Sequence, residues 1–274
     1  MNTSASGGKS FPGGLSAQSE FSGRVRRCSF DGQPAAVKSY DEPRLSGRRL
    51  LHAVAALWRG SLPVEDLSAQ RRCVFEKATL AVWRKHGFRA PSVLGDAIDA
   101  EGRPCLYLEW IDGPTLAERL ASSDVPYAEK LCLLGRILAD SAGRHLVAVT
   151  AREPKLVHFD SNTRNVILAS GGPVHIDFEM GSLHNPVALS ASEEAGKFLR
   201  WAARDVGPGA IDDLAGIAVA AYERLPEVLA DIPGRVLGRK GQFWHRRRDL
   251  ARHRRNPADV TIADVAKAVS RALR

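Results

Sequence analysis

The sequence predicts an α+β protein of two lobes, a small mainly antiparallel β lobe with helices and a larger, mainly helical C-terminal lobe. Two observations carry this prediction: strand-like segments gather before residue 112, and helical periodicity dominates after it. The 274 residues suffice for one large domain or two modest lobes. We expect a flexible leader over residues 1–20, an N-terminal nucleotide-binding lobe over 21–112 and a catalytic lobe over 113–274.

The N-terminal lobe begins with two strand-like segments, residues 24–30 and 35–40, on either side of Asp31-Gly32. This dipeptide favours a tight hairpin, because glycine tolerates a positive φ angle. Apolar residues then recur at spacings of three and four, which predicts amphipathic helices. The expected helices cover residues 46–58 and 67–86, and the expected later strands cover residues 91–95 and 105–110.

The lobe boundary is expected at Asp112-Gly113-Pro114, a chain break suited to a hinge. The elements that follow are mostly helical by the same periodicity. The expected elements are helices over residues 115–121 and 127–147, a strand-turn-strand over 166–176, and helices over about 190–206, 210–230 and 259–273.

The cysteines and the apolar runs point to a cytoplasmic protein. Cys28, Cys73, Cys105 and Cys132 are widely spaced without a C-x-x-C pair, so we expect reduced thiols rather than disulfides or a zinc site. The first residues lack the pattern of a secretory signal, and the apolar runs are far shorter than the roughly 20 residues of a membrane span. We expect no transmembrane segment, with peripheral attachment to the inner membrane face left open.

Three fragments carry the functional argument: Ala36-Val37-Lys38, His158-Phe159-Asp160 continuing to Asn165, and Asp177-Phe178-Glu179. Phosphoryl transfer requires a carboxylate at the attacking hydroxyl, oxygen ligands for Mg²⁺ and a cation on the phosphates. These fragments contain all three kinds of group.

The strand-turn-strand over residues 166–176 has a geometric consequence for two of these residues. A hairpin centred on residue 171 would place Asn165 opposite Asp177 at its open end. One carboxylate and one amide oxygen, completed by nucleotide phosphates, form a sensible Mg²⁺ site. Asp160 would lie on the preceding loop, where it could accept the proton of a substrate hydroxyl.

These motifs resemble those of the protein-kinase-like superfamily, whose catalytic loop reads H-x-D-x-x-x-x-N and whose metal loop reads D-F-G or D-F-E. The resemblance implies an ATP- and Mg²⁺-dependent kinase in which Asp160 is the catalytic aspartate. It implies that Asn165 and Asp177 hold the metal, Asn165 being part of the catalytic loop, and that His158 is structural. Lys38 would bind phosphates and act in catalysis.

The resemblance also implies partners for the lysine and the adenine. Glu76 is the best candidate for the acidic partner of Lys38, and Glu65 is the second. The segment from Leu106 to Gly113 resembles the kinase hinge, where backbone groups of Glu109 and Ile111 would bind adenine.

The chain departs from typical protein kinases, which favours the small atypical branch of the superfamily. No G-x-G-x-x-G precedes Lys38, and residues 16–23 are the nearest substitute for a phosphate-covering loop. Asn162 stands where protein kinases carry Lys, and Arg164 where a small residue is common. No A-P-E sequence follows Asp177, so a long activation segment does not fit. The extra helix over 46–58 resembles that of RIO-type and of lipopolysaccharide-core or Kdo kinases.

The resulting expectation is transfer of the γ-phosphate of ATP to a hydroxyl of a sugar, a lipid-linked molecule or another small molecule. The branch that the chain resembles also includes aminoglycoside phosphotransferases. Two alternatives remain: an atypical RIO-like Ser/Thr protein kinase, and a pseudokinase or binding module without chemistry.

The chain's net charge of +8 lies in one segment. Residues 234–255 contain nine Lys and Arg against Asp249 alone, so the rest of the chain is neutral. This segment could serve solubility, or it could bind an anionic membrane surface, RNA or an acidic protein. Phe243 and Trp244 within it could stack on bases.

Overall fold

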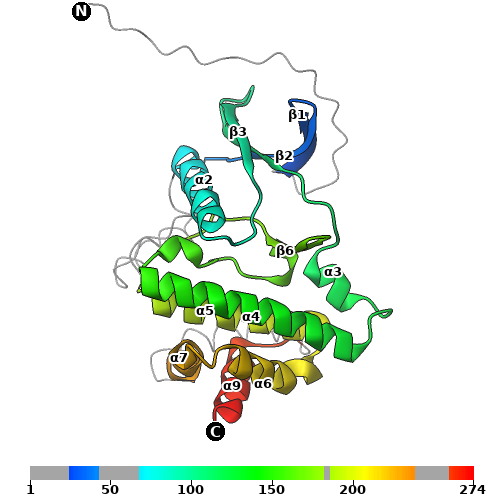
Figure 1. The fold of residues 1–274 in the computed structure, drawn as a ribbon, viewed down its shortest axis with the longest axis vertical. Coiled ribbons are helices and arrows are strands. Elements are labelled where there is room, and N and C mark those ends of the chain that lie inside the picture. The colour runs from blue at the N-terminus through cyan, green and yellow to red at the C-terminus, as the bar shows by residue number, and fades with distance from the viewer. Residues whose placement is uncertain (1–24, 43–67, 182–185, 238–258) are drawn as a thin grey trace, which may run out of the picture.

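The computed structural model describes residues 25–42, 68–181, 186–237 and 259–274. The protein is α+β, with a small antiparallel sheet formed within residues 25–109 and several helices below it (Figure 1). Several sequence predictions lie outside the described residues: the leader over 1–20, the loop over 16–23, the helix over 46–58, Glu65 and residues 238–255 of the basic segment.

The four-stranded sheet has the order β1-β2-β4-β3, and all neighbouring strands are antiparallel. The predicted hairpin at Asp31-Gly32 is confirmed, because these two residues adopt φ angles of 48° and 79° and join β1 to β2. The strands are β1 (Val25–Phe30), β2 (Gln33–Ser39), β3 (Val93–Ile98) and β4 (Pro104–Glu109).

The strand expected over residues 91–95 begins and ends later than predicted, since β3 continues to Ile98. The reason is the turn after it. Oδ1 of Asp99 accepts hydrogen bonds from the backbone amides of Glu101 (3.1 Å) and Arg103 (2.8 Å), so the chain reverses at Asp99 rather than at Gly95.

Helix α2 (Ala69–Lys85) lies beside the sheet (Figure 1), and its bounds agree with the helix expected over 67–86. Ser68 begins it, because its hydroxyl accepts a hydrogen bond from the Arg71 amide. The buried face of the helix includes Leu80 and Trp83, and also the charged Arg72 and Glu76.

The helices of the C-terminal part pack around a common apolar core that includes Leu134, Phe198 and Leu214. The single helix expected over 210–230 is two helices, because residues 222–225 form a turn and Pro226, which lacks an amide hydrogen, starts the second. None of the helices within the described ranges is long and apolar enough to cross a membrane. The helices are α3 (Leu116–Ala121), α4 (Tyr127–Ala151), α5 (Val187–Val206), α6 (Ile211–Ala221), α7 (Pro226–Leu237) and α9 (Ile262–Ala272).

Candidate functional site

Lys38 is the centre of a buried charged cluster formed by β2, α2 and the segment after β6 (Gly172–His175). Its Nζ atom lies 2.9 Å from Oε2 of Glu76 and 2.5 Å from Oδ1 of Asp177. The carboxylate of Glu179 follows at 3.9 Å. The structure thus brings together three of the residues singled out in the sequence, although Lys38 and Asp177 are 139 positions apart.

The electrostatics of this cluster keep Lys38 charged. Burial alone would lower the pKa of Lys38, but the surrounding carboxylates outweigh burial and raise the pKa above its usual value. Glu179 shows the opposite balance: burial raises the pKa of its carboxyl, and the nearby Lys38 only partly offsets this effect. The cluster therefore holds a permanent cation close to carboxylates.

Glu76 is fixed from three directions. Besides Lys38, its Oε2 accepts a hydrogen bond from the Tyr40 hydroxyl at 2.6 Å, and its Oε1 accepts one from the Phe178 amide at 3.1 Å. Tyr40 follows Lys38 by two residues, so the strand alternation directs both side chains to the same face. A single carboxylate thus connects β2, α2 and the segment that carries Asp177.

The hairpin that leads to Asp177 differs from the prediction by one residue. β5 (Val166–Ala169) pairs with β6 through Ala169 opposite Gly172, so a two-residue turn places Asn165 opposite Ile176 rather than Asp177. The Ile176 amide donates to the Asn165 carbonyl at 3.0 Å. Asp177 follows with a φ of 66°, in the left-handed region that non-glycine residues seldom adopt.

The loop before β5 brings Asp160 and Asn165 together. Nδ2 of Asn165 donates to the carbonyl oxygen of Asp160 at 2.9 Å and to its Oδ2 at 3.1 Å. Asn162 shapes the loop, because its Oδ1 accepts hydrogen bonds from the amides of Arg164 and Asn165 and starts a short 3₁₀ turn, η3 (Thr163–Asn165). The amide nitrogen of Asn165 thus faces Asp160.

His158 and His175 are buried beside the ring of Trp83 on α2, with ring centroids 6.1 and 5.2 Å from it. Burial lowers the pKa of both imidazoles. Nε2 of His158 donates to the Ile176 carbonyl at 2.8 Å, which links the loop of Asp160 to the strand before Asp177. The geometry suits a structural role for these histidines.

A buried ion pair lies under this loop. Glu194 on α5 accepts hydrogen bonds from the His158 amide (2.6 Å), from Nη1 of Arg144 on α4 (3.1 Å) and from Nε2 of His145 (2.8 Å). Arg144 also donates to the Leu156 carbonyl. The pair therefore ties the start of the Asp160 loop to the helices beneath it.

The donor set suits a hard divalent cation. Carboxylate oxygens of Glu76, Asp177 and Glu179 lie within 4.8 Å of one another. Glu76 is the least suited of the three, because Lys38, Tyr40 and the Phe178 amide already occupy its oxygens. Asp177, whose side chain is 36% exposed, and the amide oxygen of Asn165 fit the preference of Mg²⁺ for oxygen ligands.

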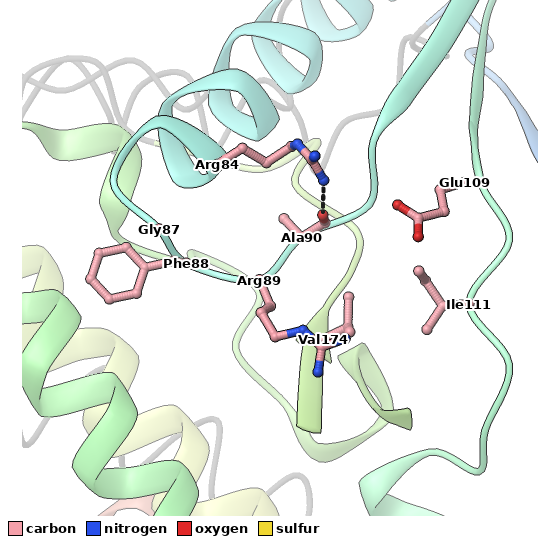
Figure 2. Close-up of a pocket in the computed structure, with 8 residues that line it drawn as sticks. All are labelled: Arg84, Gly87, Phe88, Arg89, Ala90, Glu109, Ile111 and Val174. Atoms are coloured by element: carbon pink, nitrogen blue, oxygen red, sulfur yellow. Dashed lines mark hydrogen bonds between the residues drawn. The ribbon is translucent and has the colours of Figure 1, made fainter. Parts of the chain in front are cut away.

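The predicted hinge residues Glu109 and Ile111 both line a pocket of about 250 Å³, together with residues 87–90, Arg84 and Val174 (Figure 2). Lys38 and Asp177 are not among its lining residues. The Glu109 carboxylate accepts hydrogen bonds from the amide and hydroxyl of Ser92 at 3.1 and 2.8 Å. Glu109 pairs with Ala35 in the sheet, so the alternation places its side chain on the face away from Lys38.

Sequence reasoning missed Tyr40, Arg72 and Glu194. Arg72 precedes Glu76 by one helical turn and contacts the Glu179 carboxylate at 3.2 Å, so helical spacing could have indicated it. Tyr40 could have been found from strand alternation. Glu194 has no local signal, because its contacts come from α4 and from the loop of His158.

Comparisons with known proteins do not identify a family. No protein-family model matches the chain, and no curated protein matches it.

Proposed function

We propose that this protein is an ATP- and Mg²⁺-dependent phosphotransferase of the protein-kinase-like superfamily, which transfers the γ-phosphoryl group to a hydroxyl of a sugar, a lipid-linked molecule or another small molecule. The observation that carries the proposal is the buried contact of Lys38 with both Glu76 and Asp177. This contact joins two fragments of the sequence motif to a third residue on α2.

In this proposal Lys38 contacts the phosphates of ATP, and Glu76 holds the ammonium group in place. Asp177 and the amide oxygen of Asn165 would hold Mg²⁺, which would supply positive charge to stabilise the negative charge that develops on the phosphates. Asp177 would exchange its contact with Lys38 for the metal. The backbone of Glu109 and Ile111 would bind adenine.

Asp160 would orient the acceptor hydroxyl and take its proton. The acceptor oxygen forms a bond to the γ-phosphorus while the bond from that phosphorus to the β–γ bridging oxygen breaks, and ADP leaves. Asn165 holds Asp160 in place through the two hydrogen bonds of its amide nitrogen.

The connection between β6 and α5 supports a small-molecule acceptor. β6 ends at His175 and α5 begins at Val187, so residues 176–186 contain the metal loop and leave no room for a long activation segment. This short connection argues against a typical protein kinase, and the D-F-E reading of residues 177–179, which resembles that of small-molecule kinases, favours a small or lipid-linked acceptor.

The test is incubation of the purified chain with γ-labelled ATP, Mg²⁺ and a fractionated cell extract. We expect label in a small-molecule or lipid fraction, and loss of at least 100-fold of the transfer in Asp160→Asn, Asp177→Asn and Lys38→Met. The matched control is Asp124→Asn, because Asp124 is exposed between α3 and α4.

Other outcomes of this experiment contradict the proposal. Label in a protein band alone would identify a protein kinase. Transfer of labelled phosphate at the wild-type rate by Asp177→Asn would contradict the proposal that Asp177 holds Mg²⁺. Failure of Mg-ATP to raise the melting temperature would favour a binding module. A ligand that binds the folded protein should raise the free energy of unfolding by about 2.7 kcal/mol when its concentration is 100 times its dissociation constant.

A further inference from the structure

Three arginines surround one tryptophan on α5. The guanidinium carbons of Arg164, Arg200 and Arg204 lie 5.8, 5.3 and 4.9 Å from the ring centre of Trp201. Arg164 and Arg204 are exposed, and Trp201 is half-buried. Such stacking orients a guanidinium and leaves N–H groups at its edge for a further partner.

This arginine cluster, Arg164, Arg200 and Arg204, adjoins the loop that carries Asp160. Arg164 itself belongs to the loop, between Asp160 and Asn165. Lys197, one helical turn before Trp201, donates to the Phe159 carbonyl at 2.8 Å, and Thr163 donates its hydroxyl to Asp205, one turn after Trp201. One face of α5 therefore packs along the loop.

Two carboxylates lie beside the arginine cluster. The carboxylate of Asp205 accepts the Thr163 hydroxyl, and that of Asp259 lies 3.8 Å from Nε of Arg204. Arg164 and Arg204, the two exposed members of the cluster, approach the same ring to 5.8 and 4.9 Å. Like charges gathered around one ring repel each other, and a bound anion would relieve this repulsion.

We propose that the arginine cluster binds an anionic group, a phosphate or a carboxylate, on the acceptor whose hydroxyl is phosphorylated. This inference rests on the proposed function and names the class of its acceptor. Arg164 and Arg204 would hold the anion by charge-assisted hydrogen bonds, and Trp201 would keep both guanidinium groups in place. The acceptor hydroxyl would then lie toward Asp160, on the same loop as Arg164.

A binding experiment tests the cluster without any need for turnover. The probes are glucose 6-phosphate and glucose, which differ only in the phosphate, measured against the full chain by isothermal titration calorimetry at 20 and 150 mM salt. We expect glucose 6-phosphate to bind, its affinity to fall with salt, and glucose to bind at least tenfold more weakly.

The test variant is the double substitution Arg164→Gln/Arg204→Gln, which we expect to weaken the binding of glucose 6-phosphate at least tenfold. The matched control is Arg224→Gln, because Arg224 is exposed in the turn between α6 and α7. Melting temperatures close to that of the wild type show that the variants are folded. A second double variant, Arg164→Lys/Arg204→Lys, keeps the charge and should retain part of the binding.

A second arm separates a soluble acceptor from a lipid-borne one. Vesicles of phosphatidylglycerol and of phosphatidylcholine are sedimented with the wild type and with the glutamine double variant. Retention on phosphatidylglycerol that is lost in the double variant supports a lipid-borne phosphate at the cluster. Retention that persists in that variant contradicts a lipid-borne source.

The proposal is overturned if the glutamine double variant binds glucose 6-phosphate as the wild type does, or if the wild type does not distinguish it from glucose. These outcomes are independent of the proposed function. Phosphotransfer without binding at the cluster removes this inference alone. Binding at the cluster without any Mg-ATP effect on the chain removes the kinase, and with it the role of the anion as part of an acceptor, but leaves the anion site.

Discussion

Oε1 of Glu76 accepts a hydrogen bond from the backbone amide of Phe178 at 3.1 Å, although the two residues are 102 positions apart. The other oxygen of the same carboxylate accepts hydrogen bonds from Lys38 and Tyr40. The carboxylate of Glu76 is thus a physical connection between α2 and the segment that carries Asp177. A displacement of α2 would strain or break this contact with the residue that follows Asp177.

Glu76→Gln is expected to lower kcat/KM for phosphoryl transfer by about 100-fold, the scale of a small misplacement of reacting groups. The amide keeps the volume but has only one acceptor oxygen, so its NH₂ group must face either the Phe178 amide or the Lys38 ammonium, both of which are donors. Kinetics with labelled ATP measure the effect, with the exposed Glu223→Gln as the control. Activity within twofold of the wild type would contradict this role of Glu76.

Tyr40→Phe should lower the free energy of unfolding by about 1–3 kcal/mol, because the buried Glu76 loses a donor and cannot gain water in its place. Urea denaturation measures this change. The control is Tyr127→Phe, whose hydroxyl donates to Asp213 at 2.7 Å on the surface, where water can replace it. An equal loss of unfolding free energy in both variants would contradict the prediction that the buried hydrogen bond to Glu76 stabilises the protein more than the exposed one to Asp213.

Arg144→Met should lower the free energy of unfolding by about 3–5 kcal/mol, since it leaves the carboxylate of Glu194 buried without its main counter-charge. Adding Glu194→Gln to that variant should restore part of the loss, because the amide oxygen still accepts from the His158 amide and no buried charge remains. A double-mutant cycle in urea gives the coupling. Strictly additive losses would show that the two charges do not depend on each other.

Gly113→Ala should lower the free energy of unfolding by about 3 kcal/mol or more. Gly113 has a φ of 145°, and a Cβ atom there would lie 2.4 Å from the Leu168 carbonyl oxygen, which belongs to the backbone. Gly143 on α4 is the contrasting position, because a Cβ atom there meets nothing within 4 Å. Gly143→Ala should therefore raise stability by about 0.5–1 kcal/mol. Thermal unfolding of both variants checks the two signs, and a tolerated Gly113→Ala would contradict the close approach.

The free energy of unfolding should fall as the pH is lowered from 7.5 to 5.5. Burial depresses the pKa of His145, His158 and His175 below the ordinary value of 6.5, so these side chains bind fewer protons in the folded protein than in the unfolded chain. Each such histidine contributes a slope of up to about 1.4 kcal/mol per pH unit between its unfolded and its folded pKa.

Urea titrations at several pH values measure this slope. His175→Leu should reduce this slope by the contribution of about one proton, because the variant lacks one titrating group. The substitution suits the site, since Nε2 of His175 has no hydrogen-bond partner among the described residues and its ring packs against Trp83. Stability that is flat between pH 7.5 and 5.5 would contradict the prediction. At lower pH a further loss should follow, because Arg144 and His145 hold the pKa of Glu194 well below its ordinary value of 4.5 despite burial.

Much of the local structure could be predicted from neighbouring residues. Asp31-Gly32 predicted its hairpin, and the spacing of apolar residues predicted α2 nearly to the residue. Pro226 marked the break that the prediction of one helix over 210–230 overlooked. In the candidate site, the motif spacing singled out Lys38, Asp160, Asn165 and Asp177 before any contact was known, while their catalytic roles remain predictions.

The sequence by itself determined the turns, the helix faces and the identity of the chemically capable residues, because these depend on φ preferences and on periodicity over a few positions. Only the tertiary structure decided the register that places Asn165 opposite Ile176, the burial of Glu194 beneath His158, and the gathering of arginines around Trp201. Local preferences cannot specify such pairs. Each pair forms because side chains that are distant in the sequence are buried next to each other, and the packing of the helices and the sheet determines which side chains these are.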